Sequence, residues 1–238
     1  PILVALCGND DAGKKLHAIL DQQGMTTEGI VNSDARPTTV KTRVIASGQH
    51  VVRVDEESDI IANESEEQQL LTRIEKLLPA CNVVIFEDYD KGVLNANLIA
   101  KAVQLAQAHK IPTVVDPKKR NFLAYNKVSL FKPNLKEMRE GLKIDLESGN
   151  QEQLLKAIEI LKEKLSVGGV MATLSEHGVY IDYKNEKIKI PAHPREIADV
   201  SGAGDTVVSI AALCVALNLS SKQIANLSNL GGGLVCQH

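Results

Sequence analysis

The chain has 238 residues, 44% of them hydrophobic and 24% charged, which suits a large globular domain with a sizeable core. Its formal net charge is −3, it has no Trp and only 3% aromatic residues, so we expect neither nucleic-acid binding nor a base-stacking surface. No apolar run reaches the roughly 20 residues that span a bilayer, and no signal peptide is visible, so we expect a cytoplasmic protein without membrane contact.

Short apolar runs alternate with amphipathic helical patterns along most of the chain, as expected for strands covered on both faces. The expected core strands are 2–6, 83–86, 113–115, 128–131 and 170–174. Two helical faces are marked by Leu94, Leu98, Ala102 and Leu105, and by Leu154, Ile158, Leu161 and Leu165. This alternation predicts one three-layer α/β domain over 1–238, with a mostly parallel sheet and right-handed crossovers.

Residues 38–55 break this rhythm, because 39–44 alternates with period two and a second strand pattern follows Gly48. We expect an antiparallel β flap here, with Lys41 and Arg43 on one face. Two cations on one side of a flap suit an anionic ligand, although a solvated strand face explains them equally well. The acidic stretch 56–68 is expected to be a loop that leads into a helix around 69–78.

The segment Gly8–Lys14 fits the spacing of a P-loop and follows a strand. A P-loop needs Ser or Thr after its Lys to hold magnesium, and this chain has Lys15 there. Asp10 and Asp11 would also repel phosphate. We therefore favour an ordinary strand-to-helix turn in which Asp10 or Asp11 caps the helix.

Four cysteines, widely spaced and with no C-x-x-C pair, predict reduced thiols rather than a zinc site: Cys7, Cys81, Cys214 and Cys236.

A glycine-rich turn, Gly202-Ala203-Gly204-Asp205, precedes an apolar helical run at 207–213. Small residues let backbone N–H groups approach a charged ligand, and a helix N-terminus adds partial positive charge. Such a turn can stabilise a phosphoryl group in transfer while Asp205 takes the proton of an attacking hydroxyl. An ordinary Asp near a helix start is the competing interpretation.

The run from Asp199 to Thr206, D-V-S-G-A-G-D-T, resembles the C-terminal signature of the ribokinase-like (PfkB) carbohydrate kinases. The resemblance implies a sugar kinase that uses ATP and Mg²⁺, with Gly202, Ala203 and Gly204 as the anion hole and Asp205 as the base. The same resemblance covers nearly the whole chain.

Further elements of that family follow in order. Asn134 and Glu137 match its N-x-x-E element, which implies that both help to place magnesium and phosphate. Asp116 and Lys118 match a strand-end D-P element near the phosphates, and Asn134 is assigned to the nucleotide as well. The run 173–178 resembles the T-L-G-x-x-G nucleotide loop, which implies nucleotide contacts from Thr173, Ser175 and Gly178; Ser175 replaces the usual Gly.

The flap sequence 36–46 is similar to that of heptose 7-phosphate kinases, which in many bacteria form half of a bifunctional ADP-heptose synthase. The resemblance implies a heptose 7-phosphate substrate, bound through its phosphate and hydroxyls by Lys41, Arg43, Arg53, Asp88 and Lys91. Residues 87–92 resemble the element S-D-Y-x-K-G, from which Glu87 departs.

Three expectations stay open at this point. The acceptor is heptose 7-phosphate, or another sugar such as a fructose phosphate or ribose, or the chain is a non-catalytic nucleotide-binding relative. The flap suggests a homodimer. Both ends of the chain read as interrupted inside the fold, with the family's substrate-binding G-D and G-G-A-A-N elements expected before residue 1.

Overall fold

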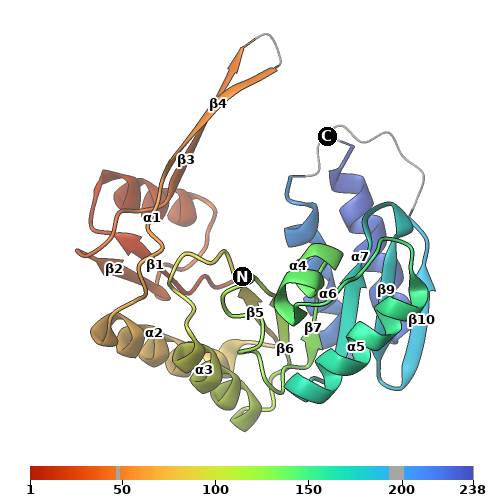
Figure 1. The fold of residues 1–238 in the computed structure, drawn as a ribbon. Helices are drawn as coiled ribbons and strands as arrows, with labels where there is room; N and C mark the ends of the chain where they lie inside the picture. Colours follow the sequence, from red (N-terminus) through yellow and green to blue (C-terminus); the bar gives the residue numbers. More distant parts are fainter. Residues whose placement is uncertain (47–48, 193–200, 238) are drawn as a thin grey trace. The chain divides into compact units, whose positions relative to one another are not determined.

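The computed structural model describes residues 1–46, 49–192 and 201–237. They form two compact units: an N-terminal unit of Pro1–Pro79 and Asp90–Leu98, and a C-terminal unit of Ala80–Tyr89 and Ile99–His238 (Figure 1). The single domain expected over 1–238 stays a prediction. No helix within the described ranges has the length and apolar character needed to cross a membrane.

The N-terminal unit contains β1 (Ala5–Gly8), α1 (Asp11–Gln22), β2 (Ile30–Ser33), β3 (Val40–Ala46), β4 (Gln49–Glu56) and α2 (Glu64–Leu77). β1 and β2 pair in parallel, and Cys7, Leu20 and Ile30 form a small core beside them. The expected strand at 2–6 was therefore placed too early. β2 was missed because its four residues, I-V-N-S, are too few to show a pattern.

Helix starts in this unit follow their capping residues. The carboxylate of Asp10 accepts from the Gly13 N–H at 2.7 Å and caps α1. Asn63 and Glu66 form a reciprocal capping box at the start of α2. The expected loop over 56–68 was therefore wrong in its last part, because this box starts the helix at Glu64.

The flap is an antiparallel hairpin of β3 and β4, as expected for 38–55. Lys41 lies opposite Asp55, and Arg43 lies opposite Arg53, so these side chains share one face. The other face carries Val44, Val52 and Val54, which are 44%, 48% and 54% exposed. The hairpin thus has one charged face and one apolar face.

The C-terminal unit holds the remaining elements, including all of α3 from Ile99 on: β5 (Val84–Glu87), α3 (Ala96–Ala108), β6 (Thr113–Asp116), β7 (Leu130–Phe131), α4 (Leu135–Leu142), α5 (Gln151–Leu165), β8 (Gly169–Thr173), β9 (Val179–Tyr183), β10 (Glu186–Ile190), α6 (Ala203–Ala216) and α7 (Ser221–Val235). Two short 3₁₀ turns lie at Leu78–Ala80 and Ser175–His177. The strands form one sheet in the order β10-β9-β8-β7-β6-β5. Pairing is parallel from β5 to β8 and antiparallel from β8 to β10.

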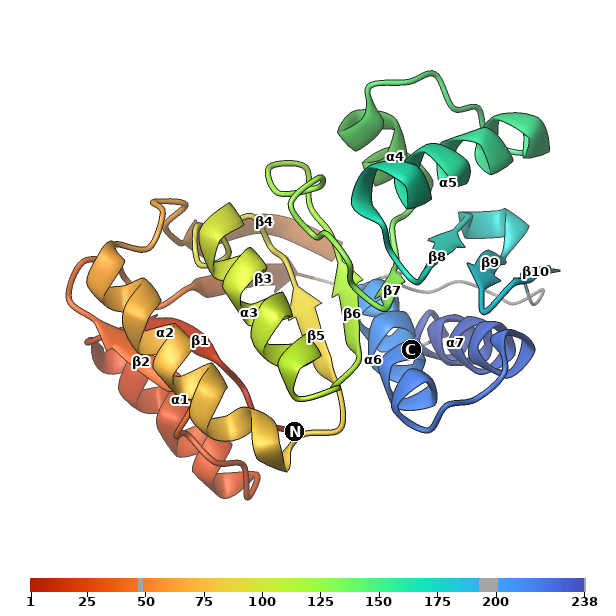
Figure 2. The same cartoon turned by 90° about the horizontal axis from the view of Figure 1, so that it is seen from below.

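Helices cover both faces of this sheet, with α4 and α5 on one side and α6 and α7 on the other (Figure 2). The core under α6 and α7 joins sheet residues such as Val114 and Met171 to Val208 and Ile224. A glycine at position 231 allows close packing, because a Cβ there would lie 2.1 Å from Ile210 Cδ1. This packing fixes α6, whose N-terminus carries the predicted catalytic turn.

The expected strands in this unit correspond to β5, β6, β7 and β8 within two residues at each end. The antiparallel strands β9 and β10 were missed. Their residues mix charged and apolar side chains, and the Lys184-Asn185 turn between them, with both φ angles positive, is the hairpin signal that was passed over. The mostly parallel α/β architecture itself is confirmed.

Candidate active site

The predicted catalytic turn forms the start of α6. Gly202 is the N-cap residue with a left-handed backbone (φ 77°), and Asp205 is the third residue of the helix. As glycine, Gly202 has no side chain to cap the helix, so the first N–H groups of α6 keep their capacity to bind an anion. Asp199 and Val200, which belong to the predicted motif, lie outside the described residues.

Asp205 belongs to a cluster of three carboxylates. Glu87 ends β5, Asp116 ends the neighbouring strand β6 in register with it, and carboxylate oxygens of all three residues lie within 4.8 Å of one another. Glu87 and Asp205 share a side-chain hydrogen bond. A Cβ on Gly204 would lie 3.7 Å from Asp116 Oδ2, which places Asp116 beside the glycine turn.

One buried cation compensates this negative charge. Lys132 is 2% exposed, and its Nζ lies 3.0 Å from Asp116 Oδ1. The two groups form an ion pair, but their contact does not have the geometry of a hydrogen bond. Lys132 was not among the predicted site residues. Its position directly after β7, at the carboxyl end of a parallel strand, is the signal that could have identified it.

Two neighbours of Asp205 have raised pKa values. Burial, the charge of Asp116 and the hydrogen bond with Asp205 raise the pKa of Glu87 to about 8. Burial of the Tyr89 hydroxyl, together with the charge of Asp205 and a hydrogen bond to it, raises the pKa of Tyr89. At neutral pH Glu87 is therefore protonated, and Asp205 is the carboxylate that accepts from both neighbours.

Asn134 and Glu137 form a capping box at the start of α4, with Asn134 Oδ1 accepting from the Glu137 N–H at 2.8 Å. Lys118 Nζ lies 2.5 Å from Glu137 Oε1. Burial lowers the pKa of Lys118, but the charges of Asp116 and Glu137 outweigh this effect and raise it. The ends of β6 and β7 therefore bring together four of the predicted site residues: Asp116, Lys118, Asn134 and Glu137.

The predicted nucleotide loop lies beside this group. Thr173, at the end of β8, forms a parallel bridge with Asn134. Ser175 has a left-handed backbone (φ 52°), which explains in physical terms why a Gly is usual at this position. Gly178 also has positive φ (83°), and a Cβ there would lie 2.0 Å from the Ile190 carbonyl oxygen.

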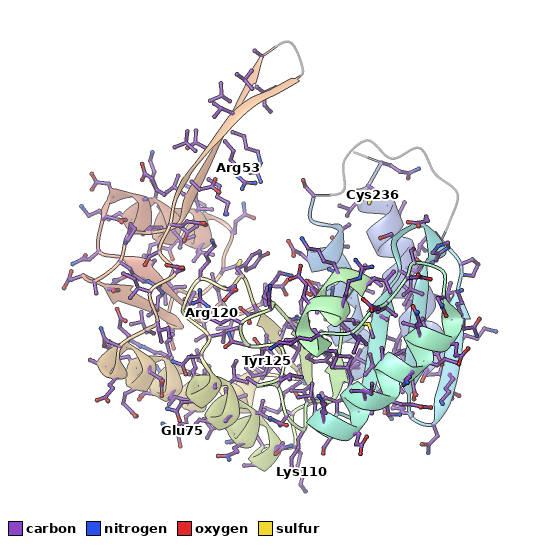
Figure 3. The ribbon with its side chains drawn as sticks, viewed as in Figure 1. Arg53, Glu75, Lys110, Arg120, Tyr125 and Cys236 are labelled. Carbon is purple, nitrogen blue, oxygen red and sulfur yellow. The ribbon has the colours of Figure 1, made fainter. Side chains whose placement is uncertain are left out.

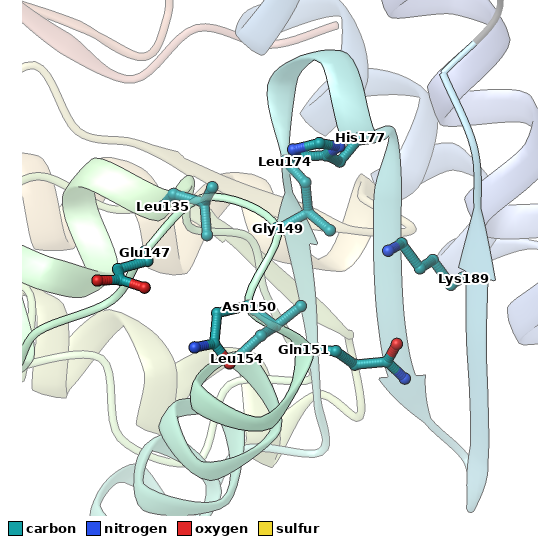
Figure 4. A pocket seen from close by; sticks show the side chains of 9 residues that line it. All are labelled: Leu135, Glu147, Gly149, Asn150, Gln151, Leu154, Leu174, His177 and Lys189. Atoms are coloured by element: carbon teal, nitrogen blue, oxygen red, sulfur yellow. The ribbon is translucent and has the colours of Figure 1, made fainter.

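A small hollow lies next to the nucleotide loop, lined in part by Leu135, Leu154, Leu174, His177 and Lys189 (Figure 4). Leu135 and Leu174 directly follow the bridged residues Asn134 and Thr173. The hollow thus adjoins the loop predicted to bind the nucleotide.

Asp88, which was predicted to bind the sugar, has hydrogen-bond partners inside the protein. It is 3% exposed, and its Oδ2 accepts from the Tyr125 hydroxyl at 2.7 Å and from Asn121 Nδ2 at 3.1 Å. Tyr125 is fully buried and packs edge-on against Phe86. This placement favours a structural role, and the strand-end carboxylate that reaches Asp205 is Glu87 instead.

The predicted phosphate-binding cations lie in the N-terminal unit, with Arg53 on β4 (Figure 3). Lys41 Nζ lies 3.0 Å from Glu57 Oε2, and Arg53 Nε lies 2.9 Å from Asp55 Oδ1. Lys91 also pairs with Glu57, and hydrogen bonds from Lys91 and Lys41 lower the pKa of that carboxyl. Two acidic residues that were not predicted, Asp55 and Glu57, therefore hold three of the four cations in place.

Contacts of the segment Gly8–Lys14 argue against the P-loop alternative. Asp10 Oδ2 accepts from the Thr38 N–H at 2.9 Å, and the Gly8 N–H donates to Thr38 Oγ1 at 2.8 Å. A Cβ on Gly8 would lie 2.4 Å from Asp10 Oδ2. The N–H groups of Gly8 and Gly13, which a phosphate-binding loop would offer, thus already donate to side chains of the protein.

Solved structures with this fold cover nearly the whole chain. Phosphofructokinase-2 from Escherichia coli, in complex with potassium, matches 98% of this chain and 74% of its own, with a TM-score of 0.80 at 19% identity. Ribokinase from Arabidopsis thaliana, complexed with ribose and ATP, matches 99% of this chain and 75% of its own, with a TM-score of 0.72 at 17% identity. At these identities the likeness shows a shared fold.

Sequence relatives are more similar. "Bifunctional protein HldE" of Wolinella succinogenes is 36% identical over 228 residues, which is 96% of this chain and 48% of the relative. The protein of the same name from Helicobacter pylori strain HPAG1 is 34% identical over 233 residues, 98% of this chain and 50% of the relative. The chain therefore spans about half the length of the curated relatives it matches.

A family model described as "pfkB family carbohydrate kinase" matches residues 3–238. The match covers the carboxylate cluster, the glycine turn and the flap alike. The chain therefore belongs to the pfkB family of carbohydrate kinases.

Proposed function

We propose that this chain transfers the γ-phosphoryl group of ATP to a sugar hydroxyl, with Asp205 as the general base. The observation that carries the proposal is the position of Asp205 on the first turn of α6, beside N–H groups of Gly202, Ala203 and Gly204 that can bind an anion. The carboxylate takes the proton of the attacking hydroxyl, while the N–H groups stabilise the charge on the transferred phosphoryl group.

The acceptor we propose is D-glycero-β-D-manno-heptose 7-phosphate, phosphorylated on its C1 hydroxyl to the 1,7-bisphosphate. The likeness of the flap to heptose 7-phosphate kinases supports this choice, as do the relatives named HldE. Lys41, Arg43, Arg53 and Lys91 are the cations proposed to bind the 7-phosphate. The pairing of Lys41, Arg53 and Lys91 with Asp55 and Glu57 supports a pre-arranged site, because held side chains lose less entropy on binding.

Mg²⁺ is proposed to bind with ATP near Asn134 and Glu137, whose oxygen donors suit this ion. Both Glu137 oxygens already have partners, the Asn134 N–H and Lys118 Nζ. Glu137 would therefore hold Mg²⁺ through water. Asp116, Lys118, Thr173, Ser175 and Gly178 are the proposed nucleotide contacts.

A homodimer through the apolar face of the flap is proposed as well, because Val44, Val52 and Val54 are exposed together. The four cysteines are free thiols, which supports a reducing compartment such as the cytoplasm.

The test is ATP-to-ADP turnover with Mg²⁺ on a panel of heptose 7-phosphate, fructose phosphates and ribose. Asp205→Ala should lower turnover on the heptose by about 10² or more, because general-base catalysis contributes at least this much. Asp11→Ala, which removes an exposed carboxylate from the first turn of α1, is the matched control and should leave turnover unchanged. Wild-type protein that binds ATP but phosphorylates none of these sugars would refute the proposed function.

A further inference from the structure

Residues 87–92 resemble the element S-D-Y-x-K-G, which has Ser at its first position. This chain has Glu87 there. It is the last residue of β5 and lies half-buried opposite Asp116 of β6. A longer, acidic side chain at this strand end reaches Asp205: carboxylate oxygens of the two residues lie within 4.8 Å of each other, and the side chains share a hydrogen bond. This chain therefore carries a carboxyl group against its proposed base that the related element lacks.

Two ionised carboxylates have no proton between them, so a hydrogen bond from Glu87 to Asp205 requires one of them to be protonated. The groups that face Glu87 are Asp116, Asp205, the Tyr89 hydroxyl and Lys132, of which only Lys132 favours ionised Glu87. Burial and the two acidic neighbours raise the pKa of Glu87 to about 8, so the proton resides on Glu87. With the proton on Glu87, the Asp205 carboxylate is the acceptor of this hydrogen bond.

We propose that Glu87 is a positioning residue for Asp205: as a neutral carboxylic acid, it donates a hydrogen bond to the base carboxylate and fixes its orientation. The inference rests on the proposed kinase function. In the transfer step the proton of the attacking hydroxyl goes to Asp205, and Glu87 keeps its own proton. Tyr89, the second hydrogen-bond partner of Asp205, acts on the same carboxylate from the same strand end.

Two replacements of Glu87 separate a donor from a space-filling side chain. Glu87→Leu keeps much of the volume but donates nothing, and should lower kcat by about 10- to 100-fold with the KM for ATP unchanged. Glu87→Gln keeps an N–H donor, so it should retain most of the wild-type kcat that Glu87→Leu loses. Glu75→Gln, on an exposed position of α2, is the control for removal of a carboxylate.

The pH profile gives a second readout that a merely structural role would not move. Wild-type kcat should fall above about pH 8, where Glu87 loses the proton that it donates. Glu87→Gln should lack this alkaline limb, because an amide does not ionise. An unchanged limb in Glu87→Gln, or equal damage in the Gln and Leu variants, would overturn the proposal.

A cation held by the three carboxylates is the competing explanation of their spacing. In that case Glu87→Gln would raise the Mg²⁺ concentration needed for half-maximal turnover, and this result would overturn the positioning role. Unchanged Mg²⁺ dependence is the expected result.

Infrared difference spectroscopy of the protein without substrates tests the hydrogen bond apart from catalysis. At neutral pH the wild type should show a protonated carboxyl band that is lost in Glu87→Gln and kept in Glu75→Gln. If the band is present but the wild type phosphorylates no sugar, the kinase proposal fails while the hydrogen bond stands. If the wild type is active without the band, the positioning proposal fails.

Discussion

Single residues at the start of α6 set the chemistry proposed for this chain. Gly204 lies in the first turn with an ordinary helical backbone, and a Cβ there would make only van der Waals contact with Asp116, at 3.7 Å. Its lack of a side chain is therefore not required by the fold. The space beside its N–H group is what a phosphoryl group would need.

Gly204→Ala should separate activity from stability. We expect kcat to fall at least about tenfold because the methyl group crowds the anion site, while the free energy of unfolding stays equal or rises by up to about 1 kcal/mol. Turnover assays and urea unfolding measure the two quantities. Gly24→Ala is the control: at φ 67° in open space it should lose about 1 kcal/mol and keep its activity. A Gly204→Ala enzyme with wild-type kcat would contradict the anion-hole role.

At the scale of elements, the flap combines two functions on its two faces. The charged face holds the cations proposed for the sugar phosphate, and the apolar face carries Val44, Val52 and Val54. Because side chains alternate along a strand, one face can be changed without altering the other.

Val52→Lys should therefore abolish dimerisation, since it places a charge in the middle of the apolar face. Light scattering coupled to gel filtration, over a range of protein concentrations, measures the oligomeric state. Arg43→Lys, which keeps the charge of the opposite face, should remain dimeric. Wild-type protein that is monomeric at every concentration would remove the dimer proposal.

At the scale of the whole molecule, stability depends on pH through groups with shifted pKa values. Thr38 and Gly13 lower the pKa of Asp10, and Lys91 and Lys41 lower that of Glu57. The stability that ionised Asp10 and Glu57 contribute is present above the ordinary carboxyl pKa. It is lost as the pH falls through their lowered pKa values. Glu87 acts in the opposite sense, because its pKa is raised from 4.5 to about 8.

We therefore expect the stability of the wild type to decrease as the pH rises from about 4.5 to 8, a range in which folded Glu87 keeps a proton that the unfolded chain releases. Glu87→Gln should weaken this decrease and raise the melting temperature at pH 8. Thermal unfolding at a series of pH values, without metal or nucleotide, checks the slope. Parallel curves for the two proteins would show that Glu87 is ionised in the folded state.

The sequence by itself determined what depends on local chemistry and order along the chain. Apolar runs predicted β5, β6, β7 and β8, period-two alternation predicted the flap, and the run from Asp199 to Thr206 indicated the family. These signals are strong because strand burial, side-chain alternation and a glycine turn each leave a pattern within a few neighbouring residues.

The tertiary structure decided which carboxylates and cations meet. Glu87, Asp116, Lys132 and Asp205 come from β5, β6, β7 and α6, and only the parallel order of the strands brings their ends together. Burial in the same place decided that Asp88 contacts Tyr125 while Glu87 reaches Asp205. Neighbouring residues on a strand point to opposite faces, and which face meets α6 is set by packing between segments far apart in the sequence.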